Sequence, residues 1–242
     1  MRKTFRLIAL AATSALALSG CQKLDDAAFG QKVRTYLLEH PEVIQEAVEK
    51  LQEKQQAEAA KAAQAGLAKH RKALEQDPRD FVANPDGGIT VVEFFDYRCG
   101  YCKLAAPEVL QLIAENRDVR FVFKEFPIFG GESNLAAQVV LSPAAKPKTK
   151  EIYARFMAEK ALDAAAIDRI LREVGVDPAQ AKAGGESAEV QRQLRDIHEL
   201  AQALHIEGTP AFVVGDQLIS GADMGALKRA IAEARAKGMK AG

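Results

Sequence analysis

The chain has few residues of the kinds that bind metals or nucleic acids. It contains no tryptophan, four histidines and three cysteines among 242 residues. The histidines lack the spacing of zinc ligands, since even His198 and His205 lie seven residues apart, and the cysteines form only one close pair. Basic and acidic residues balance at 33 each, and no basic cluster indicates nucleic-acid binding. We therefore expect no metal, no cofactor and no nucleic-acid partner.

The amino terminus has the layout of a secretory signal. Arg2, Lys3 and Arg6 precede an apolar run over residues 7–18, and the first twenty residues contain no acid. The run is too short to cross a membrane comfortably, and no later segment reaches the roughly 18 consecutive apolar residues that a membrane helix needs. We predict that residues 1–20 are a signal peptide and that the mature protein is exported.

Residues 18–21, Leu-Ser-Gly-Cys, resemble a bacterial lipoprotein processing site. Cleavage before Cys21 and attachment of a diacylglycerol to its sulfur would anchor the protein to a membrane. Cleavage after Ala17 is the alternative, and it would leave Cys21 as a free thiol. Lipidation accounts for the odd number of cysteines, and Gln22 after the cysteine favours the outer membrane by the same resemblance. We expect a lipid-anchored protein that faces the periplasm.

Residues 21–76 are predicted to form a helical leader, rich in alanine, glutamate, lysine and glutamine. A first amphipathic helix ends near Pro41, and a second begins at Glu42 and runs for about 30 residues. The apolar positions Ile44, Val48 and Leu51 have helical spacing, but the stripe then thins to alanines. The pattern fits either a solvated spacer or an oligomerisation stalk, because coiled coils normally need a sustained apolar repeat.

The sequence Cys99-Gly100-Tyr101-Cys102 follows an apolar run over residues 89–95 and precedes a helix-like stretch from Lys103. This spacing lets both sulfurs lie in the first turn of a helix, where unpaired N–H groups and the helix dipole favour a thiolate at Cys99. Cys102 can then attack a mixed disulfide formed on Cys99. A redox dithiol is the prediction, and a structural disulfide or half of an intermolecular metal site is the alternative.

Residues 77–242 are predicted to form a second, mixed α/β domain. A strand, a helix and a strand give a parallel βαβ unit, a helical insertion over about residues 133–205 follows, and the domain ends with a hairpin and a helix. The predicted segments are strands at 80–83, 89–95 and 119–124, a helix at 103–116, strands at 211–214 and 217–220, and a helix at 223–236.

These features resemble the DsbA-like class of thioredoxin-fold oxidoreductases, in which a helical subdomain interrupts the fold. The resemblance lies in residues 92–102, Val-Glu-Phe-Phe-Asp-Tyr-Arg-Cys-Gly-Tyr-Cys, and residues 208–210, Gly-Thr-Pro, before a strand. Together with the leader, it is greatest to the suppressor-of-copper-sensitivity C group. It implies a thioredoxin fold with an inserted helical subdomain, disulfide isomerase activity and a possible homotrimer formed through residues 24–76.

The same resemblance implies roles for residues around the dithiol. Thr209 and Pro210, the latter in the cis form, would face the cysteines and bind an extended substrate segment by strand-like pairing. A proline that merely begins the strand at 211–214 is the alternative. Gly100 and Tyr101 would tune the redox potential, and a Gly-Tyr dipeptide is found in isomerases of the wider family.

Glu93 stands out because a carboxyl in a strand of valine, isoleucine and phenylalanine is costly to bury without a partner. In DsbA-like proteins the matching acid lies beneath the buried cysteine and helps remove its proton, and a lysine on the next strand partners it. Lys124 is placed in sequence to be that lysine. A salt bridge without any catalytic part is the alternative.

The sequence therefore predicts thiol–disulfide exchange on exported proteins, with a membrane redox partner that recycles the dithiol. An isomerase or reductase is the first expectation. A monomeric oxidase that donates disulfides is one alternative, and another is a lipoprotein that holds Cu(I) through Cys99 and Cys102 without catalysis. A third is an envelope spacer whose thioredoxin-like domain only binds partners.

Overall fold

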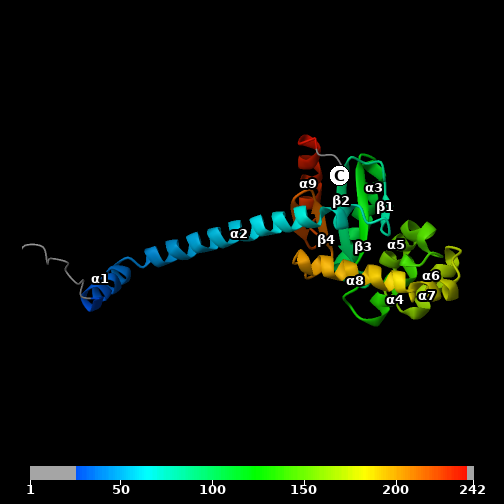
Figure 1. The fold of residues 1–242 in the computed structure, drawn as a ribbon, viewed down its shortest axis with the longest axis horizontal. Helices are drawn as coiled ribbons and strands as arrows, with labels where there is room; N and C mark the ends of the chain where they lie inside the picture. The colour runs from blue at the N-terminus through cyan, green and yellow to red at the C-terminus, as the bar shows by residue number, and fades with distance from the viewer. Residues whose placement is uncertain (1–25, 239–242) are drawn as a thin grey trace, which may run out of the picture. The chain divides into compact units, whose positions relative to one another are not determined.

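The computed structural model describes residues 26–238, so the predicted signal peptide and Cys21 lie outside the described residues. The chain divides into two compact units, residues 1–58 and residues 59–242. Each unit is described by itself below, and Figure 1 labels the helices and strands.

The described part of the first unit, residues 26–58, is helical, as predicted for the leader. Helix α1 spans Asp26–Glu39, and helix α2 spans Glu42–Glu75 and continues into the second unit. The two helices meet at Pro41, which cannot continue the backbone hydrogen bonds of α1. Seven large apolar side chains of this unit are between 40% and 69% exposed: Phe29, Val33, Tyr36, Leu38, Ile44, Val48 and Leu51.

The second unit begins within α2, earlier than the boundary predicted at residue 77. Leu67 and Leu74 are each 1% exposed and belong to an apolar cluster with Leu200 and Leu204. Gly66 lies so close to this contact that a Cβ there would be 3.6 Å from the Leu204 side chain. The end of α2 is therefore part of the core of the second unit.

A five-stranded mixed sheet forms the centre of this unit, in the order β1-β3-β2-β4-β5. Strands β2 and β3 are parallel and are joined through helix α3, while the other neighbours are antiparallel. The bounds are β1 Phe81–Ala83, β2 Ile89–Phe95, α3 Gly100–Glu115, β3 Val119–Glu125, β4 Ala211–Val214 and β5 Gln217–Ser220. The predicted mixed α/β architecture is confirmed.

A helical insertion separates β3 from β4, and Figure 1 shows α4 to α7 grouped beside the sheet with α8 leading back from them. Its elements are α4 Gly131–Leu141, the short 3₁₀ helix η1 Lys146–Lys148, α5 Thr149–Ala158, α6 Ala164–Glu173, α7 Pro178–Gly185 and α8 Ala188–Ala203. Helix α9, Met224–Ala236, follows β5. Four of these helices begin with a side chain that accepts from the first turn: Asp163 for α6, Asp177 for α7, Ser187 for α8 and Asp223 for α9.

The two faces of the sheet carry different apolar clusters. One face packs against α3, α5, α6 and α9, and it includes Val91, Phe95 and Phe121. The other face packs against the end of α2 and against α8, and it includes Val92 and Phe94. Successive side chains of a strand point to opposite faces, so each face takes alternate residues of β2.

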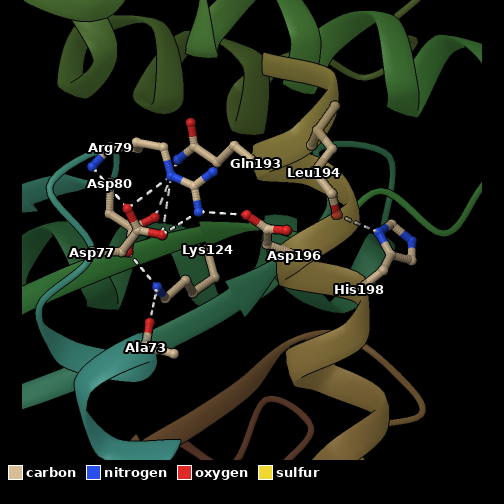
Figure 2. Close-up of polar contacts among 9 residues, drawn as sticks. All are labelled: Ala73, Asp77, Arg79, Asp80, Lys124, Gln193, Leu194, Asp196 and His198. Atoms are coloured by element: carbon tan, nitrogen blue, oxygen red, sulfur yellow. Dashed lines mark hydrogen bonds and ion pairs between the residues drawn. The ribbon is translucent and has the colours of Figure 1, made fainter. Parts of the chain in front are cut away.

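A polar cluster lies on the α2 and α8 face of the sheet (Figure 2). The buried Lys124 ammonium bonds to the Asp80 carboxylate and donates to the Ala73 carbonyl at 2.6 Å. Gln193 of α8 donates to the other oxygen of Asp80 at 3.3 Å. The cluster therefore ties the end of α2, the segment before β1, strand β3 and the insertion together.

Arg79 extends this cluster to the surface of α8. Its guanidinium lies 2.6 Å from Asp77 and 2.8 Å from Asp196. The Arg79 contacts hold the pKa of Asp77 below its usual range, although burial opposes them. The segment that carries Asp80 is thus held to α8 of the insertion.

Replacing Lys124 by methionine is expected to destabilise the protein by ~3–5 kcal/mol near pH 8, because a buried Asp80 would lose its counter-ion. Burial already raises the pKa of Asp80 to about 6, so the unpaired carboxyl would be ionised only at higher pH. The deficit in the free energy of unfolding should therefore be larger at pH 8 than at pH 5. Urea denaturation at both pH values measures it.

The exposed pair between Lys228 and Glu108 offers a matched control. Lys228→Met should change the free energy of unfolding by less than about 1 kcal/mol. The double variant Asp80→Asn with Lys124→Met should recover most of the loss. Equal effects of Lys124→Met and Lys228→Met would contradict the importance of the buried pair.

Candidate active site

The two cysteines lie where β2 passes into α3. Cys99 is the N-cap residue of α3, and Cys102 lies in its first turn. Both are buried, at 3% and 0% exposure, and both are free thiols. The turn is held by the Cys99 N–H, which donates to the Asp96 carbonyl at 3.1 Å. The sequence therefore brings the dithiol to the end of the buried central strand.

The surroundings of Cys99 favour its thiolate. A hydrogen bond from the Cys102 side chain is the largest influence, and it lowers the Cys99 pKa to about 5 against the opposing effect of burial. A contact with Thr209 and the backbone N–H groups of Cys102 and Tyr101 lower the pKa further. Cys99 is therefore ionised at neutral pH, whereas Cys102 is not.

The pKa of Cys102 is raised far above that of an ordinary thiol. Burial is the largest cause, its hydrogen bond to Cys99 adds to it, and the charge of Glu93 raises the pKa further. The Asp96 backbone N–H opposes these effects. One thiol is thus prepared to act as the nucleophile, and the other retains its proton.

The segment before β4 lies directly against Cys99. The Cys99 sulfur is 3.1 Å from the Thr209 carbonyl oxygen, and the peptide bond between Thr209 and Pro210 is cis. The Thr209 hydroxyl is buried, and no group within residues 26–238 forms a hydrogen bond with it. Residues 110 positions apart in the sequence therefore form one surface around the sulfur.

Glu93 lies on the α3 face of the sheet and is 1% exposed. The Tyr153 hydroxyl, from α5, is 3.2 Å from each of its carboxylate oxygens. Burial raises the pKa of Glu93 to about 8, and the hydrogen bond from Tyr153 opposes that shift. Glu93 therefore exchanges its proton near pH 8.

The predicted pairing of Glu93 with Lys124 is wrong. In the register of β2 and β3, Glu93 lies beside Phe123, and Lys124 lies beside Phe94. The two side chains therefore point to opposite faces of the sheet, and Lys124 pairs with Asp80 instead. The position on β3 that faces Glu93 is apolar.

A second buried carboxyl, Glu125, was missed by the sequence reasoning. It is 3% exposed, and the Tyr97 hydroxyl donates to it at 2.8 Å. Burial raises its pKa well above the usual range, and the charges of Asp96 and Glu93 add to the shift. The signal that identified Glu93, a carboxyl in an apolar strand, was weaker at Glu125, because this residue lies one position beyond the strand predicted at 119–124 and follows Lys124. Nothing in the sequence indicated that Tyr97 or Tyr153 would be their partners.

Several apolar side chains remain exposed on the elements that carry the dithiol. Tyr101 is 67% exposed and Leu104 is 73% exposed, both in the first turns of α3. Phe129, in the loop after β3, is 50% exposed. These side chains give the dithiol end of the unit an apolar surface that can meet another polypeptide.

We expect a pH titration of the reduced protein, followed by the ultraviolet absorbance of the thiolate, to show a transition near pH 5. Cys102→Ala should move this transition to higher pH, because it removes the largest contribution to the low pKa of Cys99. Cys99→Ser is the control, and it should abolish the transition. An unshifted transition in Cys102→Ala would contradict the assigned cause.

The same pKa has a consequence for stability. The pKa of Cys99 in the folded protein is below the roughly 8.5 of an unfolded cysteine. Ionisation of Cys99 therefore stabilises the reduced, folded protein, and this contribution is complete above about pH 8.5. This contribution is lost as the pH falls through about 5.

Comparison with known proteins gives two family matches. Residues 90–232 match the DSBA-like thioredoxin domain. Residues 25–58 match the N-terminal domain of the copper resistance protein ScsC. The second match ends at the same residue as the first compact unit.

Individual proteins agree with these matches. The thiol:disulfide interchange protein DsbA of Bordetella pertussis is 32% identical over 143 residues, which is 55% of this chain and 66%, just under two thirds, of that protein. A crystal structure of Proteus mirabilis ScsC in a transitional conformation is 30% identical, with a TM-score of 0.65, and the match covers 87% of this chain and 99% of that one. Salmonella enterica Typhimurium BcfH is 32% identical, with a TM-score of 0.71, over 87% of this chain and 96% of that one.

The family match covers more than half of the chain and includes the dithiol, the central strand, the helical insertion and the cis-proline segment. The predicted resemblance is confirmed. This chain belongs to the DsbA-like thioredoxin-domain family, with an ScsC-type N-terminal domain ahead of the catalytic fold.

Proposed function

We propose that this protein catalyses thiol–disulfide exchange on exported proteins in the periplasm, as a disulfide isomerase or reductase. One observation carries the proposal: Cys99 has a pKa of about 5 and lies 3.1 Å from the carbonyl of the residue before a cis-proline. A reactive thiolate beside backbone that can pair with an extended chain is what attack on a protein disulfide requires.

The exchange takes place in two steps. The Cys99 thiolate attacks one sulfur of a substrate disulfide, forms a mixed disulfide and releases the other substrate sulfur as a thiolate. In isomerisation, a different thiolate of the substrate attacks the substrate sulfur of the mixed disulfide, forms a new disulfide within the substrate and releases Cys99 as a thiolate. In reduction, Cys102 attacks the Cys99 sulfur, forms the internal disulfide and releases the substrate as a thiolate.

The second step needs Cys102 to lose its proton. Glu93 is proposed to take it, because its pKa of about 8 and the effect of its charge on Cys102 suit a general base. Lys124 has no part in this proton transfer, because it lies on the other face of the sheet. Thr209 and Pro210 are proposed to bind the substrate by strand-like pairing.

The direction of exchange depends on how strongly the Cys99 thiolate is stabilised. Its pKa of about 5 lies between the value of about 7 in thioredoxin and about 3.5 in the strong oxidant DsbA. The Tyr101 N–H contributes to this stabilisation, so the Gly100-Tyr101 dipeptide is proposed to tune the redox potential. A less stabilised thiolate suits isomerisation. The same low pKa also supports a second candidate, an oxidase that donates disulfides, because a stable thiolate favours the reduced enzyme.

The helical leader is proposed to join copies of the chain into a homotrimer. Its exposed apolar residues follow the spacing of one helical face, at Phe29, Val33 and Tyr36 and again at Ile44, Val48 and Leu51. The region proposed to form the trimer is shorter than the predicted residues 24–76, because α2 from Leu67 onward packs into the core of the second unit. Several dithiols around one misfolded substrate would raise the effective concentration for repeated exchange.

The proposed cellular location is the one that the sequence predicts. A signal peptide over residues 1–20 and a lipid on Cys21 would anchor the protein at the outer membrane, facing the periplasm. Among residues 26–238, no helix has both the length and the apolar character needed to cross a membrane. A membrane redox partner is proposed to return the dithiol to its working state.

Glu93→Gln is expected to slow the release of substrate from the mixed disulfide by about 100-fold above pH 8, since it removes the general base. In the unmodified protein this rate should rise as the pH passes through about 8, where Glu93 ionises. Tyr153→Phe is the matched variant. It removes the hydrogen bond that lowers the Glu93 pKa, so it should move the rise to higher pH without abolishing it. Stopped-flow measurement of a single turnover gives the rate of substrate release at each pH. If Glu93→Gln leaves the dependence of this rate on pH unchanged, Glu93 is not the general base.

Reactivation of scrambled ribonuclease by a soluble form of the protein that begins at Gln22, without the anchor cysteine, tests the isomerase proposal. We expect activity that is lost in Cys99→Ser and strongly reduced in a Val48→Glu and Leu51→Glu double variant, because charges on the apolar face should separate the copies. Glu49→Gln, a change between those positions, is the control. No reactivation by the unmodified protein, in a redox buffer in which a known isomerase works, would favour the oxidase or a Cu(I) carrier instead.

A further inference from the structure

A small cavity with an excess of positive charge lies between helix α3, helix α4 and the segment that joins α5 to α6. Its lining includes three cations, Arg98, Lys103 and Lys160, and two carboxylates, Glu132 and Asp163. Its volume is about 290 Å³, which is below the roughly 300–1,000 Å³ typical of sites for whole small molecules. The cavity therefore has room for one charged side chain rather than for a cofactor.

The cavity adjoins the reactive cysteine. Arg98 immediately precedes Cys99, and the Lys103 N–H donates to the Cys99 carbonyl at 3.1 Å. Two of its cations thus come from the residues on either side of the dithiol. Each residue of an extended chain adds about 3.3 Å, so a polypeptide whose cysteine lies at Cys99 brings its neighbouring residues to the cavity.

The Arg98 guanidinium has donors to spare. Its Nη1 group lies 2.8 Å from the Glu132 carboxylate and 3.4 Å from a backbone carbonyl oxygen. A guanidinium carries five N–H donors, and no contact formed by residues 26–238 uses Nε or Nη2 of Arg98. Since these donors form a fork that suits a carboxylate, Arg98 can bind a second acid while it holds Glu132.

Lys103 carries a charge that no acid of the described chain neutralises. Its ammonium donates to the Phe156 carbonyl at 3.4 Å and to the Glu159 carbonyl, at the end of α5. These contacts suit a cation at a helix C-terminus and fix the end of α5, but both acceptors are neutral. Burial lowers the pKa of Lys103, although the charge of Glu159 opposes the shift. An anion in the cavity would supply the missing counter-charge.

The acids beside Lys160 are bound to other groups. The Glu159 side chain pairs with Arg169, and the Asp163 carboxylate accepts from the Ala166 N–H at 2.8 Å as the cap of α6. Lys160 itself is exposed, and none of the ion pairs between described residues includes it. Its backbone is therefore held by the ends of two helices, while its ammonium is available to a ligand.

These cations are not needed to explain the reactivity of Cys99. The largest influences on the Cys99 pKa are Cys102, burial, Thr209 and the Tyr101 N–H, and neither Arg98 nor Lys103 is among them. The positive charge of the cavity thus has a different task from activation of the thiolate.

We infer that this cavity binds an acidic side chain of the substrate polypeptide, an aspartate or glutamate close in sequence to the cysteine that Cys99 attacks. Its carboxylate would meet Arg98, Lys103 and Lys160 and balance the charge of the lining. The inference rests on the proposed exchange function and adds a substrate class to it: segments with an acid near a cysteine react at lower concentration.

The experiment uses the reduced soluble form that begins at Gln22 and a series of ten-residue peptides with one cysteine. Each peptide is a mixed disulfide with 2-mercaptoethanol, which is uncharged, and it carries glutamate or glutamine at one of the three positions on either side of the cysteine. At one or more positions, glutamate should lower the half-saturation concentration for oxidation of the protein about fivefold relative to glutamine. This preference should shrink in about 0.5 M salt.

Lys160→Glu is expected to abolish or reverse the preference for glutamate, because it places a negative charge in the cavity. Lys160→Gln should reduce the preference to about twofold. Lys150→Glu is the matched control, since Lys150 is exposed on α5, changes the net charge equally and does not line the cavity. The control should keep the preference of the unmodified protein.

Equal half-saturation for the glutamate and glutamine peptides at every position would overturn the inference. Equal loss of the preference in Lys160→Glu and Lys150→Glu would also overturn it, because the net charge of the protein would then be the cause. If Lys160→Glu does not fold, Lys160→Gln gives the answer. Failure of the unmodified protein to react with any peptide would instead overturn the proposed function, so the two failures are distinguishable.

Discussion

Strand β2 is buried at all seven positions, and the rest of the catalytic unit depends on this burial. The strand pairs with β3 on one side and β4 on the other, so its end has a fixed place in the sheet. The dithiol follows four residues later, and the pairing with β4 brings Thr209 and Pro210 to the same end. A reactive sulfur and a backbone surface for substrate are thus set by one strand rather than by flexible loops.

Burial also separates the chemistry of the two cysteines. Cys102 is enclosed and keeps its proton, while hydrogen bonds at the start of α3 keep Cys99 ionised. Glu93 and Glu125 lie on the same face of the sheet, each bonded to a tyrosine hydroxyl. Two carboxyls with raised pKa values thus lie in one apolar layer, while the opposite face carries the buried pair of Lys124 and Asp80.

The two compact units have different tasks in the proposed function. The catalytic unit carries every group that touches the substrate in the proposed mechanism, and the helical leader offers an apolar face of its own. The leader helix nevertheless contributes Leu67, Leu74 and Ala73 to the catalytic unit. A single helix therefore takes part in both units, so the chain has no loop at the junction, which lies within α2.

The sequence by itself determined the local features of this protein: the helices around Pro41, the strand over residues 89–95, the dithiol at a helix start and the helical insertion. Each rests on spacing, propensity or a breaker within a short segment. Glu93 was also identifiable, because a carboxyl in an apolar strand is visible without a structure. Only the tertiary structure decided which face Lys124 would take, since that depends on the register between two strands. The tertiary structure alone also made Tyr153 the partner of Glu93 and the Phe129 loop the partner of Asp96. These partners lie 60 and 33 residues away in the sequence and are brought close by packing, which no local pattern encodes.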